Sequence, residues 1–454
     1  MKMMKKILAI LIVLSTCILF VLPLTACTGA DETLVVYNWE EYIDESVLDT
    51  FCEYYEEKTG KSIEVVYSKY DTNETMLTKI MNGDASIDVM CPSEYAIEKL
   101  LKADKIEKID KDEEKYPYLA NVIGDIYTKV DKVFGDFDIN GEKVSINDYY
   151  VPYMWGTLGI LYNADVISER QAKDAGWGLL WNKTDIEGLD GNIYMKDSIR
   201  DAYAAAVMYA KEEGRLPAGY EGFLADKLIN DTSADMLTVA ETMLLAQREY
   251  LKGYEVDFGK SDLACGIGYV DLAWSGDAMY AVEELGPEEG TNLAYFVPEK
   301  GSNIWFDGWV VTKASQNKEA ATEFINFLCR PDIAMLNAME IGYTSAVSEQ
   351  AIRESEGTDE DGIAVITECE YDVDEFFEDE MRYPDINDEK LGVMKDFGES
   401  NKTLVSMWER VKAADDGMGT IVTIIIILVS IIALSLLGVI IIKRINTPKK
   451  RIVR

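Results

Sequence analysis

The amino-acid sequence predicts an α/β fold in which helices cover a parallel sheet, and it predicts two lobes. Strand and helix patterns alternate over roughly the first hundred residues of the folded part, which is the order of βαβ units and hence of a parallel sheet. About 390 residues lie between two strongly apolar segments, which is more than one hydrophobic core usually supports. A hydrophobic content of 48% and eight tryptophans indicate a large folded core rather than a disordered acidic chain.

The N-terminus has the layout of a secretory signal. Three lysines precede an apolar run over residues 7–22 that ends in small residues. The run closes with Leu24-Thr25-Ala26-Cys27, which resembles the lipobox of bacterial lipoproteins, in which the cysteine receives a diacylglyceryl group. We therefore predict a lipoprotein signal peptide over residues 1–26 and a lipid anchor on Cys27. The alternative is an uncleaved membrane anchor. Either one places the following domain outside the cytoplasm.

Five short elements follow the signal in alternating strand and helix order. Apolar residues mark the buried face of each element, and glycine or proline marks its end. The predicted elements are a strand over 34–37, a helix over 47–55 before Gly60, a strand over 63–67, a helix over 76–81 before Gly83, and a strand over 87–90 before Pro92.

Aromatic and acidic residues follow the first and third of these strands, at residues 38–42 and 93–95. In parallel sheets, ligands bind beyond the carboxyl ends of the strands. Flat π-faces beside negative charge suit an organic cation, whereas an anion would be bound by bare helix N-termini. The alternative is that each of these aromatic side chains simply packs in the core.

A second apolar stretch, over residues 420–442, carries no charge and is long enough to cross a bilayer once. Six basic residues follow it within residues 443–454, so the positive-inside rule places this tail in the cytoplasm. We therefore predict a domain on the extracytoplasmic face of the cell membrane, held there by a lipid at one end and by a transmembrane helix at the other. Such a protein does not diffuse away from its cell.

The domain between these segments is strongly acidic. It contains all 82 aspartates and glutamates but only 35 of the 44 lysines and arginines, because nine of these lie in the signal and the tail, and its formal charge is about −47. Such a field repels nucleic acid and concentrates cations. The simplest alternative is that the acidic surface serves solubility alone.

The absence of histidine excludes several kinds of catalytic site at once. Ser-His-Asp and Cys-His catalysis, HExxH zinc sites and histidine pH switches all need it. The five cysteines after Cys27 form an odd set without CxxC spacing, so they predict neither a disulfide framework nor a zinc site. Carboxylate pairs of the kind that glycosidases use are the only abundant catalytic material. We predict no catalytic residues, no cofactor and no metal.

Several short motifs, each occurring once, follow one another along residues 33–412. They are Tyr37-Asn38-Trp39-Glu40-Glu41-Tyr42, Tyr67-Ser68-Lys69-Tyr70-Asp71-Thr72-Asn73-Glu74-Thr75-Met76, Pro92-Ser93-Glu94-Tyr95, Pro152-Tyr153-Met154-Trp155-Gly156-Thr157, Asp197-Ser198-Ile199-Arg200-Asp201, Ala273-Trp274-Ser275-Gly276, Trp305-Phe306-Asp307, Asn326-Phe327-Leu328-Cys329-Arg330-Pro331 and Ile341-Gly342-Tyr343. In this order and approximate spacing they resemble the periplasmic spermidine/putrescine-binding proteins of polyamine ABC importers.

The resemblance implies a two-lobed clamp of the periplasmic-binding-protein type (type II-like), which closes on its ligand and delivers it to the permease subunits of an importer. Lobe 1 would comprise residues 31–151 and 305–345, and lobe 2 residues 152–304 and 346–412. The matched positions imply a polyamine-binding site without enzyme activity. Its aromatic walls would be Trp39, Tyr42, Tyr95, Trp274, Trp305 and Tyr343, its acids Glu41, Asp201 and Asp307, and its hydroxyl Ser93.

The chemistry of a polyamine agrees with these residue types. Its ammonium charges need carboxylates, and the methylene stretches between them need flat apolar walls. Two positions depart from the family's pattern, because Ser198 stands where a carboxylate is common and a late glutamine has no counterpart near Met394. Spermidine and putrescine therefore both stay open. The same fold could instead bind thiamine, another organic cation or ferric iron, and aromatic and acidic residues could also serve a carbohydrate-active protein.

Overall fold

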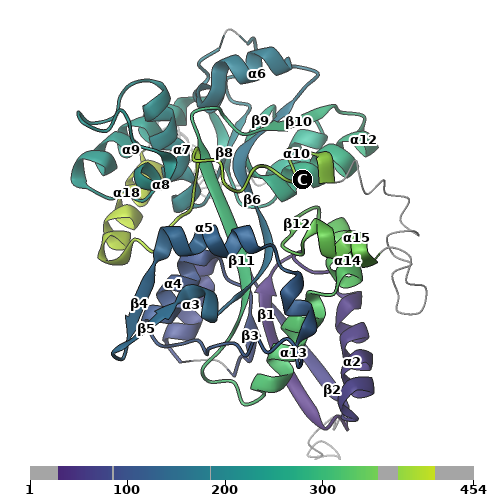
Figure 1. Cartoon of the computed structure of the whole chain (residues 1–454). Helices are drawn as coiled ribbons and strands as arrows, with labels where there is room; N and C mark the ends of the chain where they lie inside the picture. Colours follow the sequence, from purple (N-terminus) through teal and green to yellow (C-terminus); the bar gives the residue numbers. More distant parts are fainter. Residues whose placement is uncertain (1–28, 84–85, 185, 356–376, 415–454) are drawn as a thin grey trace, which may run out of the picture.

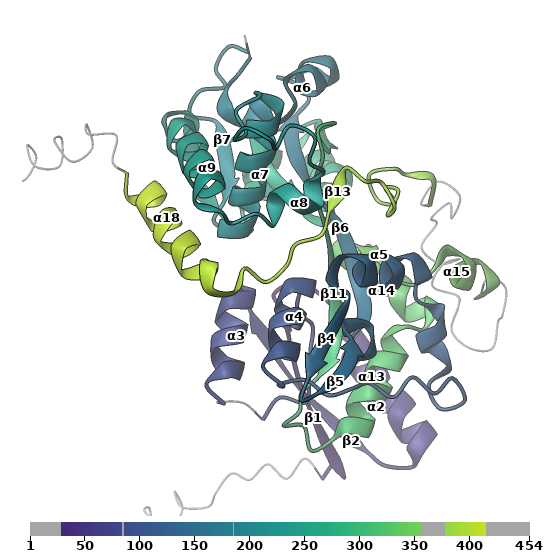
Figure 2. The ribbon, with the colours of Figure 1, turned by 60° about the vertical axis from the view of Figure 1, so that its left-hand side comes forward.

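The computed structural model describes residues 29–83, 86–184, 186–355 and 377–414. Figure 1 and, from another side, Figure 2 show that they form two lobes joined by two long strands. Within these residues, no helix has both the length and the apolar character that a bilayer span requires. The predicted signal (1–26), Cys27, the predicted span (420–442) and the tail (443–454) lie outside the described residues.

The lobe drawn in the lower half of Figure 1, here called the lower lobe, contains the predicted βαβ units. Its first strand pairs in parallel with the next two, which confirms the predicted parallel sheet. The elements of this lobe are β1 (Glu32–Trp39), α2 (Ser46–Thr59), β2 (Ile63–Tyr70), α3 (Asn73–Met81), β3 (Val89–Met90), α4 (Glu94–Lys102), α5 (Gly124–Phe134), β4 (Asp136–Ile139), β5 (Glu142–Ser145), α13 (Lys318–Leu328), α14 (Pro331–Ile341), β12 (Thr344–Ser345) and α15 (Glu349–Ser355).

Local sequence explains why these elements form where they do. The helix α2 buries Val47, Phe51 and Tyr55, which recur at helical spacing, and Gly60 ends it with a left-handed φ of 72°. The helix α3 begins where the Thr72 side chain accepts a hydrogen bond from the backbone N–H of Thr75. All five predicted elements are present. Their ends shift by a few residues because apolar periodicity marks the buried face and not the termini.

The other lobe, the upper lobe, is a second α/β unit. Its strand β7 is parallel to both of its neighbours, β8 and β9. The elements of this lobe are α6 (Glu169–Ala175), β7 (Ile193–Lys196), α7 (Ile199–Glu212), α8 (Ala225–Ile229), α9 (Ala234–Gln247), β8 (Leu251–Glu255), α10 (Gly259–Ala264), β9 (Val270–Trp274), α11 (Ser275–Tyr280), α12 (Gly286–Glu289), β10 (Leu293–Phe296) and α18 (Asn401–Ala413).

Two long strands, β6 (Val151–Asn163) and β11 (Ser302–Val311), pass between the lobes and pair with each other in antiparallel fashion. Every residue in both strands is buried. Together they connect β3 of the lower lobe to β9 of the upper lobe in one continuous hydrogen-bonded sheet. The pairing is irregular between Asp307 and Gly308, and irregularities of this kind change the direction of a side chain.

The chain returns to the upper lobe later than the predicted boundary at residue 346. Ala346, Val347 and Ile352 pack in the core of the lower lobe. The short strand β13 (Leu391–Gly392) then pairs with β11, and Met394 is buried in the core of the upper lobe. The predicted boundary lies too early because a short apolar stretch does not reveal which of two cores it will join.

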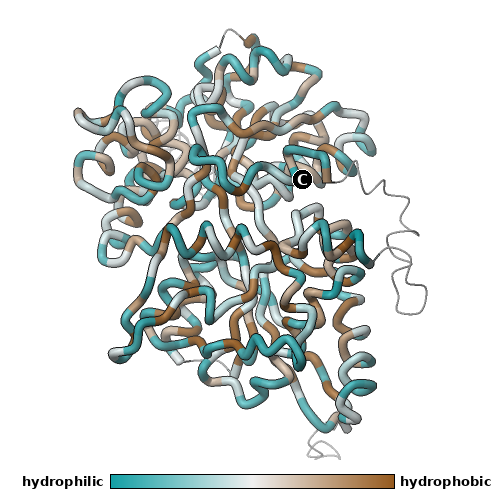
Figure 3. Tube along the Cα trace, in the orientation of Figure 1, coloured by the Kyte–Doolittle hydropathy of each residue, from teal (hydrophilic) through white to brown (hydrophobic). Residues whose placement is uncertain are grey.

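The lower lobe has one hydrophobic core and the upper lobe has two hydrophobic clusters, and all three include residues of the crossing strand β6. Figure 3 shows apolar stretches along the central strands of both lobes and polar stretches along the outer surface. Trp274 packs against the cores of both lobes. Apolar residues therefore line the junction between the lobes, whereas in a protein with one lobe such residues would lie in the core.

Candidate functional site

Strand ends and crossing strands bring nine of the ten predicted site residues to the junction between the lobes. In six of these nine, 9% or less of the residue surface is exposed, and ion pairs between the lobes close the junction beside them. The nine residues are Trp39 and Tyr42 at the end of β1, Ser93 and Tyr95 after β3, Asp201 in the first turn of α7, Trp274 at the end of β9, Trp305 and Asp307 in β11, and Tyr343 after α14.

Asp307 is a buried carboxylate that no cation balances within the described residues. It is 6% exposed, its Oδ2 accepts a hydrogen bond of 2.9 Å from the Tyr42 hydroxyl, and its Oδ1 has no hydrogen-bond partner. Burial raises the pKa of Asp307 to about 6, while the hydroxyls of Ser93 and Tyr42 oppose that shift. A buried charge is unfavourable until an opposite charge joins it. Asp307 is therefore well placed to bind a cation.

Aromatic rings surround this carboxylate. The ring centroid of Tyr343 lies 5.1 Å from that of Tyr42 and 5.7 Å from that of Trp305. The Trp305 indole N–H is buried and has no hydrogen-bond partner among the described residues. The ring of Trp39 lies 6.4 Å from Tyr42 and is fixed by a 2.7 Å hydrogen bond from its Nε1 to the carbonyl of Cys91. These rings provide the flat apolar walls that a methylene chain requires.

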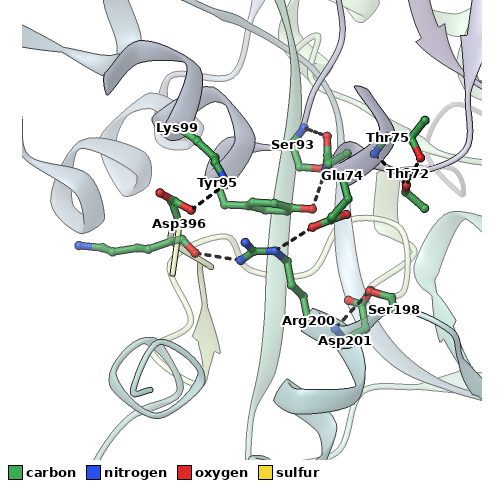
Figure 4. A network of polar contacts seen from close by, with 12 residues as sticks. Thr72, Glu74, Thr75, Ser93, Tyr95, Lys99, Ser198, Arg200, Asp201 and Asp396 are labelled. Atoms are coloured by element: carbon green, nitrogen blue, oxygen red, sulfur yellow. Dashed lines mark hydrogen bonds and ion pairs between the residues drawn. The ribbon is translucent and has the colours of Figure 1, made fainter. Parts of the chain in front are cut away.

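Tyr95, another predicted wall, already carries a cation from the protein on its ring. The guanidinium of Arg200 in the upper lobe lies 3.7 Å from the Tyr95 ring centroid and 3.5 Å from the Glu74 carboxylate of the lower lobe (Figure 4). Asn73 donates hydrogen bonds of 2.9 Å both to the Tyr95 hydroxyl and to the Ser93 hydroxyl. One face of Tyr95 is thus occupied by a contact that joins the two lobes.

Asp201 is the second acid of the junction. It is 8% exposed although it lies in the first turn of α7. Burial raises the pKa of Asp201, and hydrogen bonds from Ser198 and Trp274 oppose that shift. The Ser198 side chain also caps α7 by accepting a hydrogen bond from the Asp201 backbone N–H at 3.4 Å.

Three charged residues of the upper lobe lie at the site and are absent from the residues predicted from the sequence. Asp277 in α11 is 6% exposed, and its two carboxylate oxygens lie 3.1 Å from Lys260 Nζ and 3.8 Å from Lys196 Nζ. Lys196 Nζ also lies 4.6 Å from the centroid of the Trp274 ring. Asp277 lies in the first turn of α11, three residues after Trp274. A helix predicted to begin at Ser275, directly after a predicted site residue, would therefore have indicated Asp277. Nothing in the local sequence indicates the lysines.

Glu41 is the predicted acid that the structure leaves outside the buried group. Its side chain is 72% exposed, and its Oε2 lies 3.7 Å from Lys260 Nζ. Its backbone is left-handed, with a φ of 48°, and the neighbouring turn is held by a 3.1 Å hydrogen bond from the Asn38 side chain to the Tyr42 carbonyl. This turn directs Tyr42 inward and Glu41 outward, which sequence neighbours alone do not reveal.

Glu94 is a buried carboxyl group behind the site. Burial raises the pKa of Glu94 to about 8, and the charge of Asp307 contributes to that rise. Its Oε2 accepts a 2.9 Å hydrogen bond from the backbone N–H of Phe306. The raised pKa favours the protonated form of Glu94 over the carboxylate, and the hydrogen bond that it accepts from Phe306 positions β11.

Two surface pockets lie away from these residues. One is lined by residues of α2 and β2, among them Cys52 and Val65, and the other by residues around β10, among them Phe296 and Pro298. Neither contains a predicted site residue, in keeping with lobes that are closed over the junction. Among the described residues, no group of three or more cysteine, aspartate or glutamate side chains is arranged to hold a metal ion.

The model of the bacterial extracellular solute-binding protein family matches residues 50–361. This chain belongs to that family. A relative of this solute-binding protein, the spermidine/putrescine-binding periplasmic protein of Salmonella typhimurium, is 30% identical over 324 residues, which cover 71% of this chain and 80% of the relative. The putrescine-binding periplasmic protein PotF of Escherichia coli is 29% identical over 322 residues, which cover 69% of this chain and 78% of the relative.

A solved structure supports the fold of this solute-binding protein. The protein described as a putative spermidine/putrescine ABC transporter from Listeria monocytogenes is 27% identical and has a TM-score of 0.63, and the match covers 84% of this chain and 99% of that chain. The predicted two-lobed binding-protein fold and the family resemblance are both confirmed.

Proposed function

We propose that this solute-binding protein is an extracytoplasmic polyamine receptor that hands spermidine or putrescine to the permease of an ABC importer. The observation that carries this proposal is Asp307, a buried carboxylate with one oxygen free of hydrogen bonds and with aromatic rings around it. The relatives whose names include spermidine or putrescine support the same class of ligand. The ten predicted residues, with Glu41 at the rim, are the proposed binding site, and its role is capture rather than catalysis.

The energetics suit such a ligand. Each cation–π contact contributes ~0.5–2 kcal/mol and each charge-assisted hydrogen bond ~1.5–3 kcal/mol. A few of each reach the roughly −8 kcal/mol of a micromolar binder after the entropy of binding is subtracted. Asp201 and Asp307 interact electrostatically, because the negative charge of Asp201 helps to raise the pKa of Asp307. Two ammonium groups would relieve the burial cost of both acids.

Calorimetric titration of the full-length chain in mild detergent with spermidine, putrescine and thiamine tests this proposal. We expect a polyamine to bind with a dissociation constant of about 1 μM or below and a stoichiometry near one. Thiamine is expected to give no heat of binding. If neither polyamine gives a heat of binding, the fold serves another solute. A heat of binding with thiamine alone would identify thiamine as that solute.

The affinity is expected to fall as the pH falls below about 6. A bound ammonium lowers the pKa of Asp307 from its value of about 6 in the free protein, so binding below that pH must release a proton. The dissociation constant should be flat above about pH 7 and should rise about tenfold per pH unit below pH 6. Titrations in buffers of different ionisation enthalpy count the released protons. A flat profile down to pH 5 would contradict the assignment of Asp307.

We also propose that Cys27 carries a lipid and that residues 420–442 anchor the receptor in the membrane next to its permease. An anchored receptor stays at high local concentration. Deleting residues 420–454 is expected to lower polyamine uptake by cells at low ligand concentration without changing the affinity of the purified protein. Unimpaired uptake by the truncated receptor would refute the role of this segment.

A further inference from the structure

Protein cations already occupy part of the junction that the proposed ligand would enter. Lys260 lies in α10 with its side chain 12% exposed, and its Nζ is 3.1 Å from Asp277, 2.7 Å from Asp257 and 3.7 Å from Glu41. Two of these acids belong to the upper lobe, whereas Glu41 belongs to the lower one. Lys260 therefore lies where the two lobes meet, with its ammonium group directed at a buried carboxylate.

A second lysine neutralises the same carboxylate from the other side. Lys196 Nζ lies 3.8 Å from Asp277, 2.5 Å from Glu255 and 2.9 Å from the carbonyl oxygen of Val256, and its side chain is 1% exposed. The same ammonium lies over the ring of Trp274. The acids around both lysines raise their pKa values, so both stay charged. Internal ammonium groups thus already lie beside Asp277 and over Trp274, although Asp277 Oδ2 makes no hydrogen bond within the described residues.

Two carboxylates of the site remain without such a partner. No ion pair in the described part of the chain involves Asp307 or Asp201, although the charge of Lys196 lowers the pKa of Asp201 from beyond ion-pair distance, and Asp307 Oδ1 makes no hydrogen bond. Tyr343 lies between Asp307 and Asp277. Its ring centroid is 5.1 Å from that of Tyr42, whose hydroxyl donates a hydrogen bond to Asp307, and it packs against Gly276, the residue before Asp277. A ligand that extends from Asp307 past Tyr343 would therefore approach the ammonium of Lys260.

We propose that Lys260 is a specificity-determining residue, which supplies an internal ammonium to Asp277 and thereby limits the cleft to diamines in preference to triamines. This inference rests on the proposed polyamine function and specifies its ligand class. Two open acids match the two charges of a diamine such as putrescine. The third charge of spermidine would have to compete with Lys260 and Lys196 for Asp277, and placing a further ammonium beside these two in a desolvated site is unfavourable.

The test compares putrescine and spermidine in calorimetric titrations of the full-length chain and of Lys260→Met, which keeps an apolar stem but removes the charge. The unaltered protein is expected to bind putrescine about tenfold more tightly than spermidine or better. In Lys260→Met, the affinity for spermidine should rise about tenfold relative to that for putrescine, because Asp277 then keeps only the more distant ammonium of Lys196, at 3.8 Å.

Two control variants separate charge from folding. Lys260→Arg keeps the positive charge and should keep the preference for putrescine. Lys173→Met removes an exposed lysine that pairs with Glu169, and it should change neither affinity. A preference of the unaltered protein for spermidine, or an unchanged ratio of affinities in a Lys260→Met protein that melts cooperatively, would overturn the inference and leave the polyamine receptor intact. Absence of binding by either polyamine would overturn the receptor itself.

Discussion

Replacing Asp307 by asparagine is expected to weaken polyamine binding about 100-fold, because truncating one member of a buried charge pair costs ~2–5 kcal/mol. The amide keeps the shape of the side chain and still accepts the hydrogen bond from Tyr42. It cannot balance an ammonium charge. Since burial raises the pKa of Asp307 to about 6, the free protein carries an unfavourable buried charge at neutral pH. The variant should therefore melt at the same or a higher temperature than the unaltered protein.

Calorimetry and thermal denaturation at about pH 7.5, above the raised pKa of Asp307, measure both effects. Asp235→Asn is a matched control, because Asp235 is an exposed aspartate in the first turn of α9 and should leave affinity unchanged. The combination of lower affinity and undiminished stability is the signature of a binding acid. A variant with unchanged affinity would show that the ligand does not contact Asp307.

Replacing Gly276 by valine is expected to weaken binding by about tenfold or more through Tyr343, a residue that is distant in the sequence. A Cβ atom at Gly276 would lie 2.2 Å from the Tyr343 ring, so the ring must move. Tyr343 packs between Tyr42 and Trp305, and the loss of one aromatic wall removes ~0.5–2 kcal/mol of cation–π attraction in addition to the shape of the site. Overpacking should also lower stability by ~1–3 kcal/mol.

A glycine in open space provides the control for this prediction. A Cβ atom added at Gly222 would meet no other atom within 4 Å, and the backbone there has no positive φ, so Gly222→Val should change neither affinity nor stability. Combining Gly276→Val with Tyr343→Leu should recover part of the lost stability but none of the affinity. If Gly276→Val lowers stability and leaves the dissociation constant unaltered, Tyr343 is not a wall of the site.

The acids of the proposed site show which site residues the order of the sequence motifs predicts and which it does not. Motif order predicts Asp307 and Asp201, and the structure buries both at the junction. It predicts Glu41 with them, yet the Glu41 side chain is 72% exposed because a left-handed residue turns it outward. It does not indicate Asp277, although this residue follows Trp274 closely, and the lysines around Asp277 come from β7 and α10. Side-chain direction depends on backbone turns, and contacts between elements depend on packing, so neither is encoded in a short motif.

The sequence by itself determined the α/β class, the order of the first five elements, the family and most of the residues that meet at the junction. These follow from local physics, because apolar periodicity selects helix or strand and because strands of a parallel sheet place their carboxyl ends at one edge. Only the tertiary structure decided where the chain returns to the upper lobe after residue 346, which predicted acid points outward, and which protein cations reach Trp274, Tyr95 and Asp277. Those outcomes depend on how the two lobes pack against each other. Long-range packing of this kind produces no periodic pattern of apolar residues in the sequence.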